Sequence, residues 1–254
     1  MIRIIPRLDI KGPNVIKGVQ LECLRIVGDP QTLAEKYYKE GADELVYMDI
    51  VASLYERNNI LDIVSLAAQK IFIPLTVGGG IRSIEDIRKA LRAGADKVAI
   101  NTHATKQPEF ITRAAQAFGS QCIVGSIEAK QVPGGGWEAF IDNGRVPTGR
   151  DAVAWAKQLM SLGAGELLVT SVDKEGTAKG YDVDLIKAIA PHVSVPVIAC
   201  GGAGSPADFL SVIEDGHADA VSAAHIFHYK KHSILEVKEY LRYKKIQVRI
   251  ETVK

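Results

Sequence analysis

The sequence predicts an α/β fold in which eight parallel strands alternate with helices and close into a single (β/α)8 barrel. Three observations predict it: a length of 254 residues, strands that are apolar throughout, and two halves of the chain that repeat each other. About 250 residues is a usual size for such a barrel, and uniformly apolar strands are typical of a parallel sheet covered on both faces. An open, doubly wound sheet is the alternative.

The repeat is the most specific of the three observations. Residues 74–81 (PLTVGGGI) return as residues 196–204 (PVIACGGAG), 122 residues further along the chain. A period this long predicts two fused half-barrels rather than a solenoid. We expect the halves at about residues 1–119 and 120–254 of one TIM barrel, because two four-unit halves close on themselves.

Each predicted strand is a short run rich in β-branched and other apolar residues, which favour extended backbone. In chain order these runs lie near residues 2–8, 44–48, 72–77, 97–100, 122–127, 166–169, 195–199 and 218–222.

The segments between the strands have the apolar periodicity of amphipathic helices. They include residues 31–40, 84–93, 108–118, 151–162 and 206–214. Ser83 with Asp86 predicts a capping box at the start of the second helix. Glycines that follow predicted helices are expected to end them in the left-handed conformation; these are Gly41, Gly94, Gly163 and Gly216.

Only two connections are long, residues 11–29 and residues 129–150, and they occupy equivalent positions in the two halves. We expect both to be loops. No linker or low-complexity tract predicts a second domain.

Composition excludes several classes of function. The formal net charge is +1, which gives no reason to expect nucleic-acid binding. The three cysteines lie far apart without metal-ligand spacing and are expected to be free thiols in a reducing compartment. No apolar run reaches the roughly 18 residues of a membrane span. The sequence therefore predicts a cytoplasmic protein with no metal and no cofactor.

Two carboxylates are the candidate acid and base. Asp9 ends the first predicted strand and Glu128 ends the fifth, so the two face each other across the mouth of a barrel. Such a pair can divide general acid and base roles once its surroundings separate the two pKa values. The alternative is that each carboxylate caps a helix or pairs with a neighbouring lysine, Lys11 or Lys130.

Two glycine-rich turns precede predicted helices at matching positions, at residues 78–80 and 201–204. Backbone N–H groups at such turns bind phosphate, and Asn101 with Thr102 would complete the first cradle. Two cradles predict a small-molecule substrate that is phosphorylated at both ends, although each turn alone is also compatible with a tight βα connection. His225 and His228 are interpreted as polar residues at a helix start.

Several strings together resemble the cyclase subunit of imidazole glycerol phosphate synthase, from residue 3 to about residue 249. They are RIIP (3–6), LDIK (8–11), KGV (17–19), GDP (28–30), GADEL (41–45), VGGGIR (77–82), DKVAIN (96–101), FGSQ (118–121) and GGAG (201–204). The resemblance implies a barrel that forms a heterodimer with a glutaminase subunit on its N-terminal face. Ammonia would cross the barrel and react at the mouth with a bis-phosphorylated ribulosyl-formimino substrate.

The resemblance also implies roles for particular residues. Asp9, Lys17 and Glu128 match catalytic positions. One phosphate site corresponds to Gly80, Asn101 and Thr102, and the other to Gly176, Gly202 and His225, while Glu175 matches an aspartate of the substrate-binding mouth. A charged ring that gates the ammonia channel corresponds to Arg3, Glu44, Lys97 and Glu166.

Four positions at the mouth depart from the family pattern. Glu128 and Glu175 stand where the family has aspartate, His225 where it has serine, and Arg7 where it has cysteine. We interpret the chain as a divergent paralogue of the kind found in bacterial surface-polysaccharide clusters. There, glutaminase and barrel supply ammonia to a sugar amidotransferase that makes an acetamidino group.

The strings associated with that branch are residues 7–9, 47–58 and 134–138. Two alternatives remain at this point. The chain is either a true cyclase subunit of histidine biosynthesis, a lyase, or a barrel that activates a glutaminase without chemistry of its own.

Overall fold

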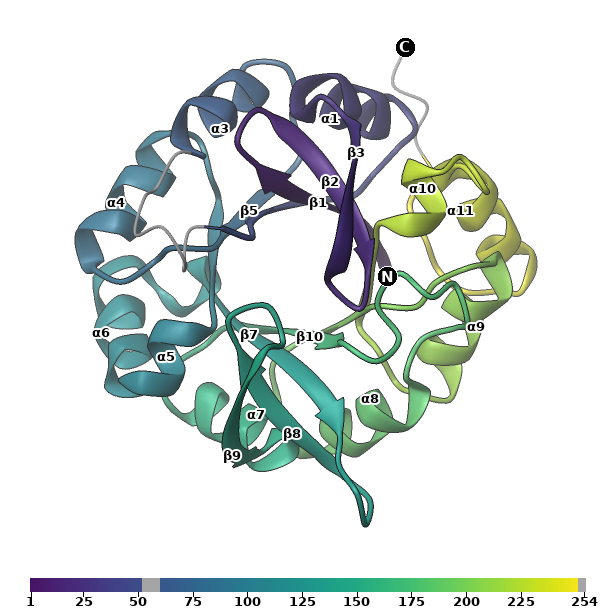
Figure 1. Ribbon diagram of the computed structural model, residues 1–254. Coiled ribbons are helices and arrows are strands. Elements are labelled where there is room, and N and C mark those ends of the chain that lie inside the picture. Colours follow the sequence, from purple (N-terminus) through teal and green to yellow (C-terminus); the bar gives the residue numbers. More distant parts are fainter. Residues whose placement is uncertain (52–59, 251–254) are drawn as a thin grey trace.

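The inner wall of the molecule is a closed cylinder of parallel strands, seen end-on in Figure 1. The computed structural model describes residues 1–51 and 60–250. Around the cylinder the parallel strands are β1 (Arg3–Lys11), β4 (Leu45–Asp49), β5 (Leu75–Gly78), β6 (Lys97–Ile100), β7 (Ile123–Gln131), β10 (Glu166–Ser171), β11 (Val197–Cys200) and β12 (Ala220–Ala223). Because β7 pairs with β10 and β12 pairs with β1, the sheet closes. The predicted (β/α)8 TIM barrel is confirmed, and the open doubly wound sheet is wrong.

Helices cover the outside of this wall. They are α1 (Pro30–Lys39), α3 (Leu61–Ala68), α4 (Ile84–Arg92), α5 (Thr102–Lys106), α6 (Glu109–Phe118), α7 (Ala152–Ser161), α8 (Val183–Ile189), α9 (Pro206–Glu214), α10 (His225–His228) and α11 (Ile234–Tyr243), with 3-10 turns at Ser120–Cys122 and Ala190–His192. The capping box predicted at Ser83 and Asp86 begins α4. None of the helices in the described ranges has the length and apolar composition needed to span a bilayer.

The left-handed conformation predicted for glycines that follow helices is confirmed at three positions and is wrong at one. Gly41, Gly94 and Gly163 have φ of 88°, 110° and 108°. After α9, however, the positive φ of 62° belongs to His217 rather than to Gly216. At Gly216 a Cβ atom would press against the carbonyl oxygen of Val212, so glycine serves close packing there.

The two long connections are β-hairpins rather than loops. The first contains β2 (Asn14–Val19) and β3 (Glu22–Gly28), and the second contains β8 (Trp137–Ile141) and β9 (Val146–Asp151). In each, the barrel strand runs on beyond the wall and pairs with the antiparallel strand that follows it. Much of β3 and β9 is exposed, which removes the apolar pattern by which sequence analysis recognises strands.

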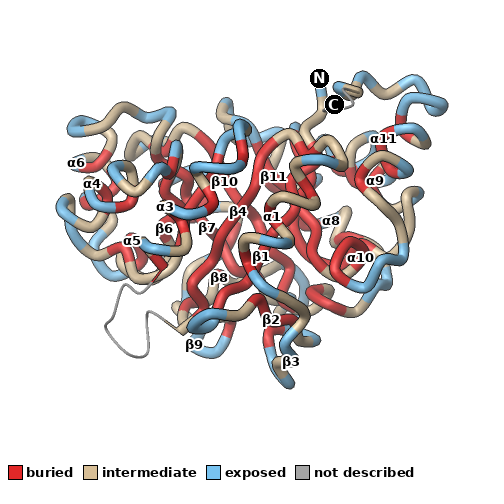
Figure 2. Tube along the Cα trace, turned by 90° about the horizontal axis from the view of Figure 1, so that it is seen from above, coloured by how far each residue is buried: buried red, intermediate tan, exposed pale blue. Residues whose placement is uncertain are grey.

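The hairpins and the N-terminus mark opposite ends of the barrel. Figure 2 shows the N-terminus at one end and the two hairpins at the other, where the parallel strands finish. Catalytic residues of (β/α)8 barrels come from this C-terminal end.

The core has two shells. One lies between the wall and the helices. The other fills the lumen with small and medium apolar side chains from Ile5, Val46, Met48, Ala99, Val124, Leu168, Ile198, Cys200 and Ala220.

Part of one string associated with the surface-polysaccharide branch, residues 47–58, lies outside the described residues. The boundary between half-barrels near residue 119 stays a prediction.

Candidate functional site

A ring of four charged side chains closes the N-terminal end of the lumen. Arg3 begins β1, Lys97 begins β6, Glu166 begins β10, and Glu44 directly precedes β4. The Arg3 guanidinium donates to Glu44 at 2.6 Å and also to Glu166. Lys97 Nζ lies 3.0 Å from Glu44 and 2.9 Å from Glu166.

Each cation in this ring therefore bridges both carboxylates, so two positive and two negative charges balance. Burial of a charge is costly unless partners and hydrogen bonds compensate for it, and every member of this ring has such partners. All four residues predicted for the gate are brought together by strands that begin at the same end of the barrel.

The two candidate carboxylates lie at the other end. Asp9 is on β1 and Glu128 is on β7, and four steps around the strand order separate these strands in either direction. Asp9 is 3% exposed and Glu128 is 7% exposed. The strand order thus puts the two carboxylates on opposite sides of the mouth, as the sequence predicts.

The surroundings of the two carboxyl groups shift their pKa values in opposite directions. Burial raises the pKa of Glu128 to about 7, opposed by the Arg7 charge and by a hydrogen bond from the Gly144 backbone N–H at 2.8 Å. Burial also acts on Asp9, but the positive charges of Arg7 and Lys17 outweigh it and hold the Asp9 pKa below its usual value. Near neutral pH one group is ionised and the other is partly protonated, which suits an acid–base pair.

Asp9 is paired with two cations, but not with its neighbour Lys11. Arg7 Nε donates to Asp9 Oδ1 at 2.7 Å, and Lys17 Nζ lies 3.6 Å from Asp9 Oδ2. Lys17 also forms an ion pair with Glu175. Burial lowers the Lys17 pKa, and the charge of Arg7 adds to this effect.

The hairpin of β2 and β3 rests on the connection that follows β10. The backbone N–H of Gln20 donates to the Glu175 carbonyl at 2.7 Å, and Gln20 Nε2 donates to the Asp173 carbonyl at 3.2 Å. Lys17 and Glu175 are consequently buried beneath the hairpin. The hairpin therefore covers the part of the mouth nearest Asp9.

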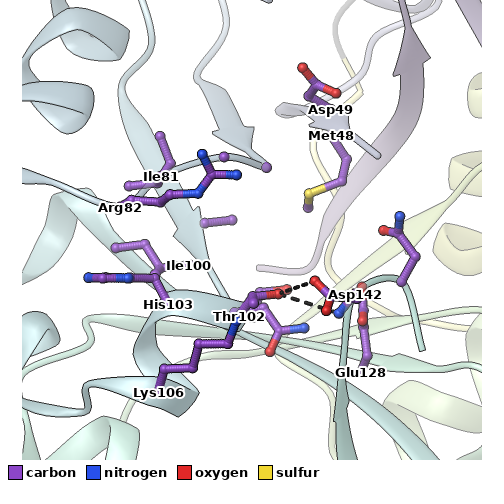
Figure 3. Close-up of a pocket in the computed structure, with 16 residues that line it drawn as sticks. Met48, Asp49, Ile81, Arg82, Ile100, Thr102, His103, Lys106, Glu128 and Asp142 are labelled. Carbon is purple, nitrogen blue, oxygen red and sulfur yellow. Dashed lines mark hydrogen bonds between the residues drawn. The ribbon is translucent and has the colours of Figure 1, made fainter. Parts of the chain in front are cut away.

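A cavity of about 270 Å³ opens at the other half of the mouth, and Figure 3 shows its side chains. Four predicted residues line it: Gly80, Asn101, Thr102 and Glu128. Thr102 Oγ1 and Asp142 Oδ1 are 3.5 Å apart. The first predicted cradle and the Glu128 carboxyl therefore share one cavity.

Sequence reasoning missed several polar residues of this cavity, namely Asp49, Arg82, His103, Lys106, Asp142 and Asn143. His103 and Lys106 follow Asn101 on the short helix α5, so their proximity was a usable signal. Asp142 comes from the tip of the second hairpin, which sequence analysis treated as loop.

The residues predicted for the second phosphate site do not line this cavity. A Cβ atom at Gly176 would overlap the carbonyl oxygen of Gly18 in the hairpin, and one at Gly202 would overlap that of Gly180. Both glycines have positive φ, 73° and 109°. Here the two glycines allow backbone segments to approach each other closely.

The two histidines of α10 have different surroundings. The His225 ring lies against Tyr229, the residue that follows this helix, with centroids 4.6 Å apart. Burial together with the charge of Lys17 lowers the pKa of His225. His228 Nδ1 is 2.6 Å from the Tyr37 hydroxyl. Burial and the Lys17 charge lower the His228 pKa to about 3, so this ring is neutral under ordinary conditions.

Comparison with known proteins agrees with this architecture. A family model described as "Histidine biosynthesis protein" matches residues 3–233. The chain is also 59% identical over 208 residues to a protein of Legionella pneumophila named imidazole glycerol phosphate synthase subunit HisF. That alignment covers 82% of this chain and 98% of the relative. The chain therefore belongs to the histidine biosynthesis protein family, in the branch of the cyclase subunit of imidazole glycerol phosphate synthase.

Proposed function

We propose that this chain is the cyclase subunit of imidazole glycerol phosphate synthase. It joins ammonia to a bis-phosphorylated ribulosyl-formimino substrate and releases imidazole glycerol phosphate and an aminoimidazole carboxamide ribotide. One observation carries the proposal. A single lumen has a charge-balanced ring at its N-terminal end and two carboxylates at its C-terminal end. The pKa values of these two carboxylates are shifted in opposite directions.

Ammonia comes from a glutaminase subunit that docks on the N-terminal face and forms a heterodimer with the barrel. The ring of Arg3, Glu44, Lys97 and Glu166 controls entry. Between the ring and the mouth the lumen is lined mostly by apolar side chains. Such a lining suits neutral ammonia better than ammonium, because burying an unpaired charge is costly.

The cavity at the mouth binds one phosphate of the substrate. Gly80, Asn101 and Thr102 supply donors beside the start of α5, and Lys106 adds positive charge at the cavity wall. Gly176, Gly202 and His225 form the second phosphate site once the hairpin of β2 and β3 moves away from Gly176.

Asp9 and Glu128 divide the proton transfers. Asp9 is ionised and accepts a proton as ammonia attacks, whereas Glu128 is protonated often enough near pH 7 to donate one to the departing group. Lys17 orients Asp9 from the hairpin side.

The test uses the purified chain with the ribulosyl-formimino substrate and saturating ammonium salt, and follows formation of imidazole glycerol phosphate. We expect turnover that Asp9→Asn lowers at least about a hundredfold, the usual worth of a positioned acid or base. Glu214→Gln, an exposed carboxylate on α9, is the control. Absence of turnover with the unaltered chain would contradict the proposal.

A second candidate is ammonia supply to a sugar amidotransferase of surface-polysaccharide synthesis. Two observations favour it. Buried Arg7 forms an ion pair with Asp9, and positions 128 and 175 carry glutamate where the family has aspartate. The name of the 59% identical relative favours the cyclase instead. The readout that separates them is rescue of a histidine auxotroph lacking its cyclase subunit. Rescue supports the cyclase.

Stimulated glutamine hydrolysis without cyclase product, together with transfer to a nucleotide-sugar acceptor when the amidotransferase is added, supports the second candidate. The same hydrolysis without that transfer supports a barrel that only activates the glutaminase.

A further inference from the structure

Arg7 occupies the lumen between the charged ring and the mouth. Side chains along a strand alternate in direction, so Arg7 points inward with Arg3, Ile5 and Asp9. It lies one layer above Ile5 of the apolar lining and one layer below Asp9. Its exposed fraction is 1%, so the guanidinium is enclosed by protein.

The side chain reaches across the barrel rather than along its wall. Arg7 Nη1 is 3.1 Å from Thr170 Oγ1 on β10 and 3.8 Å from Cys200 Sγ on β11. In the strand order, β11 and β12 separate β10 from β1. A residue of β1 can contact β10 only by crossing the interior, and the guanidinium therefore occupies the space through which the lumen meets the mouth.

Ionic contacts hold Arg7 there and connect it to the hairpin above. Its Nε donates to Asp9 at 2.7 Å, Asp9 lies 3.6 Å from Lys17, and Lys17 pairs with Glu175. These four side chains carry two positive and two negative charges. Movement of the hairpin would pull on Lys17 and, through Asp9, loosen Arg7.

One nitrogen of the Arg7 guanidinium, Nη2, forms no hydrogen bond with the described residues. Nη2 is also buried. A buried donor without an acceptor is unfavourable, and such groups in native proteins call for an explanation. The lone pair of neutral ammonia is a hydrogen-bond acceptor that could satisfy this donor.

We infer that Arg7 forms a second constriction on the ammonia route. Its guanidinium closes the lumen below Asp9, and Nη2 donates a hydrogen bond to ammonia that has passed the ring. Displacement of Arg7 then releases ammonia to the mouth. The role in ammonia transfer rests on the proposed function, whereas the closure itself does not. The cysteine that the resembling family carries at this position is too short to close the lumen in this way.

Cys200 allows the closure to be tested without substrate or partner. The probe is methyl methanethiolsulfonate, a small uncharged thiol reagent, with mass spectrometry reading each cysteine separately. In the unaltered chain the exposed Cys23 should react fast and the buried Cys200 slowly. In Arg7→Ala we expect labelling of Cys200 to accelerate at least about tenfold, because reactivity follows access, with Cys122 unchanged.

Two controls separate local opening from loss of stability. Lys238→Ala removes another buried cation, which pairs with Asp43 outside the lumen, and should leave Cys200 protected. The single variant Arg7→Ala leaves Asp9 without its closest cation and could fail to fold. The double variant Arg7→Ala/Asp9→Asn removes both charges of this pair and serves in its place in that case. An unchanged Cys200 rate in the variants lacking Arg7, or an equal acceleration in Lys238→Ala, would overturn the inference.

A second measurement addresses ammonia itself. With the glutaminase and the ribulosyl-formimino substrate, Arg7→Ala should raise the glutamine hydrolysed per product at least about twofold. Removal of Arg7 also changes the surroundings of Asp9 and could slow the chemical step. The rate of product formation from ammonium salt in the same variant measures this effect separately. An unchanged ratio would overturn the role in transfer. If the unaltered chain makes no product, the proposed function fails, while the labelling result still decides whether Arg7 closes the lumen.

Discussion

Asp9 and Glu128 have the same chemistry but ionise in different pH ranges, because their neighbours differ. Asp9 has two cations within 4 Å, whereas Glu128 accepts a hydrogen bond from Gly144 and is otherwise enclosed by protein. Sequence analysis predicted the pair from its place at two strand ends. It could not assign the acid and the base, since the cations beside Asp9 and the burial of Glu128 determine this only in the folded barrel.

The raised pKa of Glu128 makes stability depend on pH. The folded state keeps a proton between pH 4.5 and about 7 that the unfolded chain has released. The free energy of unfolding should therefore fall as pH rises through this window, by about 3 kcal/mol from Glu128 alone. Glu128→Gln stays neutral and should lack this part of the decline.

Chemical denaturation at pH 5 and pH 8 checks this expectation, and the difference between variant and unaltered chain cancels the other titrating groups. Glu214→Gln on the exposed face of α9 should retain the full pH dependence. Equal pH dependence in Glu128→Gln and the unaltered chain would show that Glu128 titrates normally.

Asp9 also contributes to stability, because it compensates two buried cations. Asp9→Asn should lower the free energy of unfolding by about 3–5 kcal/mol, the usual cost of leaving a buried charge uncompensated. Arg7→Ala/Asp9→Asn should recover part of this loss. Asp184→Asn, on the exposed first turn of α8, should cost no more than about 1 kcal/mol. Similar losses in Asp9→Asn and Asp184→Asn would contradict the ionic network.

At the scale of elements, the two hairpins are the main difference between prediction and structure. The barrel strands were predicted because their apolar runs are continuous, whereas β3 and β9 have little buried surface to mark them. Their pairing is set by the extension of β1 and β7 beyond the wall. The hairpins nevertheless supply Lys17, Asp142 and the cover over Glu175.

The first hairpin should open when its contact with Gly176 is blocked. Gly176→Ala adds a Cβ atom that overlaps the carbonyl oxygen of Gly18. We expect cleavage by trypsin after the exposed Arg25 to accelerate about tenfold, because local opening governs proteolysis of a folded chain.

Gly149→Ala is the matched control for this experiment. Gly149 has φ of 71°, close to the 73° of Gly176, but a Cβ atom there meets nothing within 4 Å. Both variants therefore carry similar backbone strain, and only Gly176→Ala pushes on the hairpin. Equal cleavage rates in the two variants would mean that the contact does not hold the hairpin closed.

At the scale of the whole molecule, barrel closure puts two charged clusters at opposite ends of one lumen. Arg3, Ile5, Arg7 and Asp9 come from a single strand and run from the ring to the mouth. Under the proposed function, ammonia moves along this axis past the ring and Arg7, and the hairpin of β2 and β3 covers the end of the path at Asp9.

Lys97→Ala should separate ammonia transfer from chemistry. Without Lys97, Glu44 and Glu166 still have Arg3 as a partner but lose the second cation that bridges them. Glutamine-dependent product formation should change at least about fivefold, while ammonium-dependent formation changes less than about twofold. Sedimentation should still detect the complex with the glutaminase. The exposed Lys157→Ala on α7 is the control, and equal changes with both nitrogen sources would exclude a gating role for the ring.

The sequence by itself determined the alternation of strands and helices, the internal repeat, and the end of the barrel at which each charged residue lies. The alternation and the barrel ends follow from local periodicity and strand direction, which neighbouring residues specify, and the repeat follows from comparing the two halves of the sequence.

Only the tertiary structure decided the pairing of Lys17 with Glu175, 158 positions apart, and the contact of Arg7 with Thr170, 163 positions apart. It also decided the opposite pKa shifts of Asp9 and Glu128. Contacts between residues distant in sequence depend on which strands face each other across the closed barrel. Desolvation of a side chain depends on whether a hairpin covers it, and no local sequence pattern specifies either one.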